Sequence, residues 1–249
     1  MIENKYDTER QEHLEQLWSM YKEKLEDGEL RKIVNRNYVY SKIPDNKKNI
    51  ILVVGINPSF RVNEKEMDYF SFKYEDVCDD QYYKRIKQIV PNNDFRIEYT
   101  DLFYYRVTKQ EIENEFLNNE VGLKFMAEQL CITQKYIEAV QPKLIVVFNK
   151  GSWKYWGKEY NEIKDTNVWM GYNFEPNKNI SCKNKKVNEE ICFLIKNLKN
   201  SKQRVCNDLK ETKLKGTPIY FSKYLGYLSK EEKSNITQDL KLLIESIKK

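Results

Sequence analysis

The sequence predicts an α/β fold, a three-layer α/β/α arrangement around a central, mainly four-stranded parallel sheet. Short apolar runs rich in β-branched residues are typical of strands buried on both faces. They alternate along the chain with stretches whose apolar residues recur every three or four positions, as in amphipathic helices. This alternation favours parallel strands with helices on both faces of the sheet. At 249 residues the chain is long enough for a sizeable core, and we expect one domain over residues 1–249.

The first expected element is a helix over residues 7–34, within a helical extension that spans residues 1–47. Its apolar positions, from Leu14 to Leu25, repeat at three- and four-residue steps. The expected elements that follow are a strand over 49–55 (NIILVVG), a helix over 82–90, a strand over 95–103, a helix over 121–140, a strand over 143–148 (KLIVVF), a strand over 217–221 (TPIYF) and a helix over 230–247. Residues 158–212 are rich in Lys and Asn and interrupt this pattern. We interpret them as an insertion between the third and fourth strands, either a basic lobe that faces DNA or a solvated connection.

The composition excludes a disordered chain but says little about partners. Hydrophobic residues make up 40% of the chain and aromatic residues 13%, more than disordered segments carry. The net charge of +5 suits a phosphate-binding protein and equally suits an ordinary surface of Lys and Glu. No signal-peptide pattern occurs in the first residues, and no run of about 18 apolar residues occurs anywhere. We therefore expect a cytoplasmic protein with no membrane partner.

Histidine and metal chemistry are disfavoured by the residue inventory. The single histidine, His13, falls in the charged first helix, far along the chain from every other motif. The five cysteines are scattered without a CxxC pair, which indicates reduced thiols rather than a zinc or iron–sulfur site. Cys182 and Cys192 as metal ligands are the weaker alternative. We expect no metal site, and chemistry that depends on carboxylates, amides, hydroxyls and backbone dipoles.

Polar or aromatic residues follow every expected strand. In parallel sheets with helices on both faces, ligands bind beyond the carboxyl ends of the strands. The four strand ends are therefore expected to converge on one cleft. Their residues are Gly55-Ile56-Asn57-Pro58-Ser59, Thr100-Asp101-Leu102-Phe103, Asn149-Lys150-Gly151-Ser152-Trp153 and Tyr220-Phe221-Ser222-Lys223-Tyr224.

The segment VVGINPSF over residues 53–60 is the most specific motif in the chain. Gly55 allows a sharp turn and a close approach to a ligand, Pro58 makes that turn rigid, and Asn57 can present its amide to a water molecule. An ordinary strand-to-loop turn uses the same residue types. The motif resembles the first motif of uracil-DNA glycosylases, and it is most similar to the mismatch-specific uracil/thymine branch.

The resemblance implies roles for residues in and near this motif. Asn57 would position the attacking water through its side-chain carbonyl, with Gly55, Ile56 and Ser59 completing the catalytic turn. Backbone N–H groups near Ile56 and Phe60 would stabilise negative charge on the base, and Pro58 would help to form the base pocket. In related enzymes an aromatic residue about a dozen positions later stacks on the flipped base. Phe70 is our choice among Tyr69, Phe70 and Phe72, although aromatic residues at these positions also suit a core.

Three further segments are similar to the family's by order and position. In YTDLFYYRVT, residues 99–108, Asp101 either reads the edge of the base or caps a turn, and Arg106 contacts either phosphate or solvent. In KLIVVFNKGSWKYWG, residues 143–157, the turn with Asn149, Gly151 and Ser152 would meet a phosphate through its backbone N–H groups.

The last segment, GTPIYFSKYLG over residues 216–226, departs from the family. Thr217-Pro218 replaces the usual His-Pro, and no equivalent is evident for the family histidine that stabilises the departing base. Ser222 would still contact phosphate, and Lys223 or Tyr224 would enter the duplex as a wedge.

The resemblance covers roughly residues 48–226 and implies a DNA glycosylase. Such an enzyme flips the target nucleotide from the DNA stack and hydrolyses the N-glycosidic bond of uracil or of a modified or mismatched pyrimidine, without a metal or organic cofactor. Three alternatives stay open: a non-catalytic nucleic-acid-binding module, a nucleosidase that acts on free nucleotides, and an unrelated nucleotide-binding α/β protein. Against the last, the chain has neither common Gly-rich phosphate loop.

Overall fold

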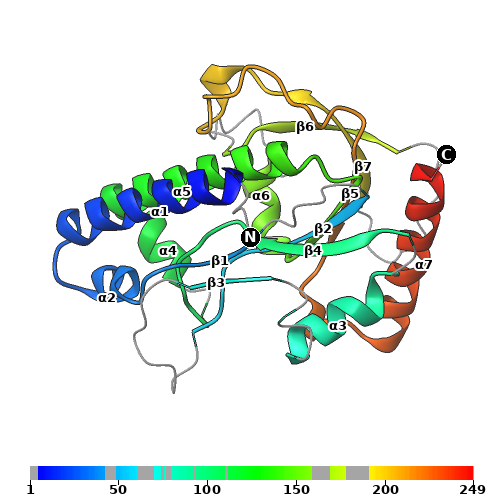
Figure 1. The fold of residues 1–249 in the computed structure, drawn as a ribbon, viewed down its shortest axis with the longest axis horizontal. Helices are drawn as coiled ribbons and strands as arrows, with labels where there is room; N and C mark the ends of the chain where they lie inside the picture. The colour runs from blue at the N-terminus through cyan, green and yellow to red at the C-terminus, as the bar shows by residue number, and fades with distance from the viewer. Residues whose placement is uncertain are drawn as a thin grey trace.

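The computed structural model describes residues 5–42, 49–60, 70–73, 76, 80–91, 94–109, 112–158, 169–177 and 191–248. These residues form a mixed α/β fold around a central, mostly parallel sheet (Figure 1). The strand order is β4-β2-β5-β8-β7-β6. Four neighbouring strands run parallel: β4 (Arg96–Asp101), β2 (Ile50–Gly55), β5 (Leu144–Phe148) and β8 (Pro218–Ser222). Two antiparallel strands extend the sheet: β7 (Cys192–Leu198) and β6 (Tyr172–Pro176).

The expected parallel strands are confirmed, and so are the helices between them. The helices of the described residues are α1 (Lys5–Lys24), α2 (Glu29–Asn35), α3 (Gln81–Ile89), α4 (Ile112–Leu117), α5 (Glu120–Val140), α6 (Trp153–Trp156) and α7 (Lys230–Ile247). Short 3-10 turns follow β5 and β8, namely η2 (Lys150–Ser152) and η5 (Leu225–Tyr227). The bounds of α7 agree with the helix predicted over 230–247, and a capping box of Ser229 and Glu232 marks its start.

Both faces of the parallel part of the sheet are buried, as the apolar strand sequences indicate. Along β2, Ile50, Leu52 and Val54 belong to a core that includes side chains of α1, α2 and α5. The alternate residues Ile51 and Val53 belong to a second core that includes side chains of α3 and α7. Successive side chains of a strand point to opposite faces, so the two cores lie on opposite sides of β2. Figure 1 shows α1 lying along α5, and α3 close to α7.

The structure corrects the sequence prediction in three places. The sheet has six strands rather than four, because β6 and β7 fall inside the segment that we interpreted as an irregular insertion. The helix expected over residues 7–34 is two helices, α1 and α2, separated around Gly28, a residue that is unfavourable inside a helix. The expected helical extension also contributes β1 (Val39–Ser41), which pairs in parallel with β3 (Phe70–Phe72) in a small second sheet.

The cysteines and the helices bear on two further expectations. Cys131 and Cys206 are free thiols, but Cys192 is disulfide-bonded, so the expectation of reduced thiols is wrong for Cys192. Within the described part of the chain, none of the helices combines the length and the apolar character needed to cross a membrane.

Candidate functional site

The carboxyl ends of the four parallel strands bring the sequence-predicted residues to one edge of the sheet. Gly55, the last residue of β2, pairs in register with Asp101, the last residue of β4. Phe148 at the end of β5 pairs with Ser222 at the end of β8, and the backbone N–H of Asn149 donates to the Ser222 carbonyl at 3.1 Å. This edge is where ligands bind in parallel α/β sheets.

Asp101 is a buried carboxyl group at this edge. Its residue is 7% exposed, and its Oδ1 accepts a hydrogen bond of 2.6 Å from the hydroxyl of Tyr99. Burial raises the pKa of Asp101 from 3.8 to about 7, and the bond from Tyr99 opposes part of that rise. At neutral pH the carboxyl is therefore divided between its acid and its carboxylate, so it can both donate and accept a proton.

Gly55 is required by the position of this Tyr99–Asp101 pair. A Cβ atom on Gly55 would overlap both the Tyr99 hydroxyl and Asp101 Oδ1. The requirement is one of space, because the absent side chain lets the carboxyl group lie directly against the backbone of β2. This finding gives Gly55 a physical role that the motif alone did not reveal.

Asn57 lies two residues beyond Gly55. Its side chain joins residues 55–60, the motif loop, to the segment that follows β4. Its Nδ2 donates to the carbonyl oxygens of Pro58 and Val107, each at 2.9 Å. The two bonds fix which end of the amide carries the nitrogen. Asn57 is 8% exposed, so its role is partly structural.

Backbone hydrogen bonds reinforce the same connection along the whole motif. Leu102 N–H donates to the Gly55 carbonyl at 3.2 Å, Phe103 N–H to Ile56 at 2.9 Å, and Val107 N–H to Pro58 at 3.0 Å. The hydroxyl of Thr108 also donates to the Phe60 carbonyl. Residues 55–60 are thus held against residues 102–108, which favours a rigid, preorganised loop. Within this loop, Ile56 is buried, Pro58 and Phe60 are half-buried, and Ser59 is exposed.

The turn after β5 does not present its amides to a phosphate in this structure. Gly151 N–H donates to the Asn149 side chain at 2.9 Å, and Ser152 N–H donates to the Asn149 carbonyl at 3.0 Å. The Ser152 hydroxyl also donates to the Asn149 carbonyl, at 2.7 Å, and Ser152 is fully buried. These groups stabilise the turn, so a DNA contact through Ser152 stays a prediction without support from the geometry.

Arg106 is not a surface residue. It is 3% exposed, and its guanidinium lies 5.1 Å from the centre of the Phe60 ring. The guanidinium of Arg36 lies 4.5 Å from the same ring centre and donates to the Arg106 carbonyl at 3.3 Å. The ring of Phe60 is therefore packed by two cations, an arrangement that holds the end of the motif loop in place.

Lys223 and Tyr224 lie beyond β8 and are the exposed predicted contacts with DNA. Lys223 Nζ lies 3.7 Å from Glu232 Oε1, and the Tyr224 ring stacks on Tyr82 of α3 at a centroid distance of 6.2 Å. Phe70 begins β3, but its side chain lies outside the described part of the structure.

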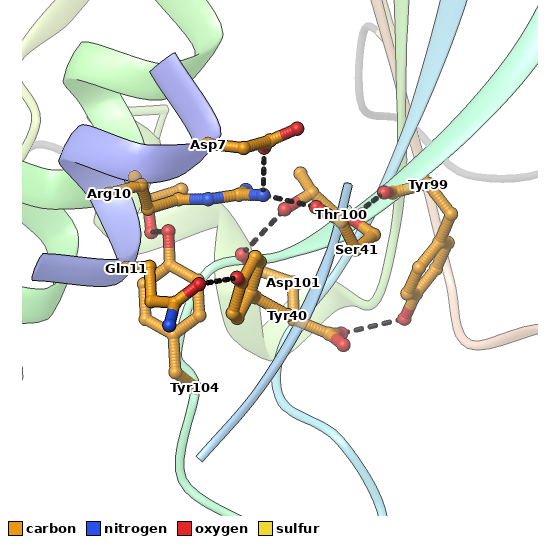
Figure 2. A network of polar contacts seen from close by, with 10 residues as sticks. Asp7, Arg10, Gln11, Tyr40, Ser41, Tyr99, Thr100, Asp101 and Tyr104 are labelled. Carbon is orange, nitrogen blue, oxygen red and sulfur yellow. Dashed lines mark hydrogen bonds and ion pairs between the residues drawn. The ribbon is translucent and has the colours of Figure 1, made fainter. Parts of the chain in front are cut away.

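The sequence analysis missed the residues that surround Asp101. Figure 2 shows a network of hydrogen bonds that runs from α1 to the end of β4. The guanidinium of Arg10 donates to the Asp7 carboxylate at 2.8 Å and to the Ser41 carbonyl. The Ser41 hydroxyl donates in turn to the Tyr99 carbonyl. Tyr99 then donates to Asp101. The alternation of strand side chains was an available signal, because Tyr99 and Asp101 are two residues apart on one strand.

No metal-binding arrangement is found among the described residues, where no group of three or more His, Cys, Asp or Glu side chains lies close enough to hold an ion. The candidate site consists of Asp101 and Tyr99, which lie against Gly55, and of Asn57 in the motif loop.

No family model matches the chain, and no curated protein matches its sequence.

Proposed function

We propose that this protein is a DNA glycosylase that removes uracil, or a modified or mismatched pyrimidine, on a three-layer α/β/α scaffold. The observation that carries the proposal is the buried carboxyl group of Asp101, whose pKa is about 7. This carboxyl group lies against Gly55, two residues before Asn57 in the chain. A group with a pKa near the working pH is suited to act as a general base.

The reaction requires only groups of this strand edge and a water molecule. The target nucleotide leaves the DNA stack and enters the site. The oxygen of the water bonds to C1′ of the sugar as the N-glycosidic bond breaks, and the base departs with the bonding electrons. The Asp101 carboxylate accepts the proton of the water and returns it to the base. The fixed amide of Asn57 orients the water through its side-chain carbonyl.

Stabilisation of the departing base is the weakest part of the site. The only histidine, His13, is exposed on α1. Thr217-Pro218, where β8 begins, replaces the His-Pro of the family. A donor aimed at developing charge can contribute about 3–4 kcal/mol. We propose that backbone N–H groups near Ile56 and Phe60 replace part of that contribution, so turnover is slow with poor leaving groups.

The test is release of a free base from a panel of oligonucleotides under single-turnover conditions. The panel carries uracil, a G·T mismatch, or hydroxymethylated or glucosylated cytosine, each in single and double strands. We expect release of one base, with a matching abasic site that alkali cleaves. Release from free nucleosides but not from DNA would instead indicate a nucleosidase.

A non-catalytic DNA-binding module is the second candidate, and the replacement of the family His-Pro by Thr217-Pro218 favours it. This candidate predicts binding to DNA with no base release from any member of the panel. The glycosylase proposal would then be wrong.

A further inference from the structure

A row of tyrosine rings leads from solvent to the Asp101 carboxyl. The row consists of Tyr227, Tyr224, Tyr82 and Tyr99. The ring centroids of Tyr227 and Tyr224 are 5.4 Å apart, those of Tyr224 and Tyr82 are 6.2 Å apart, and those of Tyr82 and Tyr99 are 5.9 Å apart. The hydroxyl of Tyr99 donates a hydrogen bond to Asp101. The row therefore ends at the carboxyl group that we propose as the general base.

Exposure falls steadily along the tyrosine row. Tyr227 is 86% exposed and Tyr224 is 39% exposed, whereas Tyr82 is half-buried and Tyr99 is 4% exposed. A tyrosine as exposed as Tyr227 leaves most of its ring in contact with water. Exposed aromatic side chains that follow one another toward a site suit a ligand with several flat rings.

The structure holds the outer rings in place. The rings of Tyr82 and Tyr224 are nearly parallel, with an interplanar angle of 15°. A Cβ atom on Gly226 would lie 2.6 Å from Cε1 of Tyr224, so the glycine leaves room for that ring. Helix α3, which carries Tyr82, packs against η5, which carries Tyr227. Tyr224 therefore lies between Tyr82 and Tyr227 in the row.

Exposed cations that could bind phosphate occur close in sequence to two residues of the tyrosine row, Tyr82 and Tyr224. Helix α3 carries Lys84, Arg85 and Lys87 and no acidic residue, and the three cationic residues are exposed. Lys223 lies next to Tyr224 in the chain and is also exposed. Aromatic rings combined with cations are typical of sites that bind single-stranded nucleic acid, because unpaired bases offer both faces for stacking.

We propose that the tyrosine row is a binding site for single-stranded DNA, on which unpaired bases stack in sequence toward Asp101. This inference rests on the proposed glycosylase function for the choice of DNA, and it assigns to Tyr82, Tyr224 and Tyr227 a role in binding. A phosphate of the bound strand contacts Arg85, which lies three positions after Tyr82 and therefore close to it on the surface of α3.

The experiment measures the affinity for a labelled 12-residue oligothymidine by fluorescence anisotropy, with an Asp101→Asn background so that no excision occurs. Tyr227→Ala and Tyr224→Ala are each expected to weaken binding by about 5- to 150-fold, the range for one stacked base. Tyr227→Phe keeps the ring and retains the affinity. Gly226→Ala, which displaces the Tyr224 ring while keeping it, weakens binding.

Two controls separate stacking from other effects. Tyr6→Ala removes a tyrosine of α1 that is 42% exposed, and it leaves the affinity unchanged. Arg85→Gln lowers the slope of log affinity against log salt by about one, as expected for the loss of one phosphate contact. Thermal melting confirms that the surface variants fold like the wild type.

The outcomes distinguish this inference from the proposed function. Tyrosine-dependent binding of the single strand without base release from any substrate keeps the stacking site and removes the glycosylase. Wild-type affinity in both Tyr224→Ala and Tyr227→Ala overturns the stacking site, whether or not a base is released. A wild-type protein that binds no single strand, or only a duplex, also overturns it and makes the tyrosine row a surface for another partner such as a protein.

Discussion

At the scale of single residues, the chemistry of Asp101 is determined by what surrounds its carboxyl group. Burial raises the pKa of Asp101 to about 7, and the hydrogen bond from Tyr99 acts in the opposite direction. The space for both side chains exists only because residue 55 is glycine. Tyr99 is therefore a positioning residue for the proposed general base.

Changing Tyr99 to Phe should move the pH profile of base release. The Tyr99 hydrogen bond lowers the pKa of Asp101, so its loss raises that pKa further. A general base acts as its carboxylate, and the rate should therefore rise with pH through about 7 in the wild type and at higher pH in Tyr99→Phe. Single-turnover rates from pH 5.5 to 9 check this. Tyr220→Phe, which removes another buried tyrosine bond to an aspartate (Asp239, 3.0 Å), is the matched control, and superimposable profiles would contradict the role of Tyr99.

The same carboxyl should make folding stability depend on pH. The pKa of Asp101 in the folded protein lies above its ordinary value of 3.8, so the group's contribution is fully present below pH 3.8 and is lost as pH rises through about 7. A rise from 3.8 to about 7 corresponds to at most about 4 kcal/mol. Asp101→Asn carries no such group, and its free energy of unfolding relative to the wild type should increase from pH 5 to pH 8. Urea denaturation at the two pH values measures this difference, and a constant difference would be inconsistent with the raised pKa.

At the scale of elements, the motif loop is a rigid part of the fold because it is fastened to the segment after β4. Backbone hydrogen bonds join residues 55–58 to residues 102–107, and the Asn57 side chain adds a bond to Val107. A loop held in this way keeps its geometry before a substrate binds, which is what orientation of a water molecule requires.

Replacement of Asn57 by Ala should therefore reduce stability as well as activity. The change removes two hydrogen bonds of 2.9 Å and leaves a buried carbonyl oxygen with one donor fewer. We expect a loss of about 1–2 kcal/mol in the free energy of unfolding, measured by urea denaturation. Asn173→Ala, which removes an exposed bond to Asn197, should cost less than about 0.5 kcal/mol. Equal effects of the two changes would show that the Asn57 bonds do not stabilise the loop.

The sequence predicted the central elements well because their signals are local. A buried parallel strand such as β2 is a short run of β-branched residues, and Ser229 marks the start of α7 by its capping box. The strands β6 and β7 were missed because polar residues interrupt their apolar residues: Asn and Glu in β6 (YNFEP), and Lys and Asn in β7 (CFLIKNL). The contact of Tyr99 and Asp101 with Gly55 depends on the register between β4 and β2. That register cannot be predicted from the residue pattern of a single segment.

At the scale of the whole molecule, the parallel strands bring polar residues from distant parts of the sequence to one edge of the sheet. Asp101 ends β4, and Asn57 lies two residues beyond the neighbouring strand β2. Tyr82 of α3 and Tyr227 of η5 belong to the tyrosine row, which ends at Tyr99. The positive net charge of +5 favours association with a polyanion, although it does not identify one.

Affinity for DNA should decrease steeply as salt increases. Phosphate contacts release counterions, so log affinity falls linearly with log salt concentration, with a slope near the number of phosphates contacted. Titration of a labelled duplex and a labelled single strand between 50 and 200 mM salt measures the slope. A flat response would mean that DNA is not the substrate, and would favour free nucleotides.

Single-turnover base release by the wild type and by Asp101→Asn, on the substrate that the panel identifies, tests the central claim most directly. Asp239→Asn is the matched control, because Asp239 is also buried and also accepts a bond from a tyrosine hydroxyl. If Asp101 is the general base, its replacement reduces the rate by about 100-fold or more, while the Asp239 variant, once shown to be folded, retains it. Wild-type rates in Asp101→Asn would contradict the account and remove this carboxyl from the mechanism.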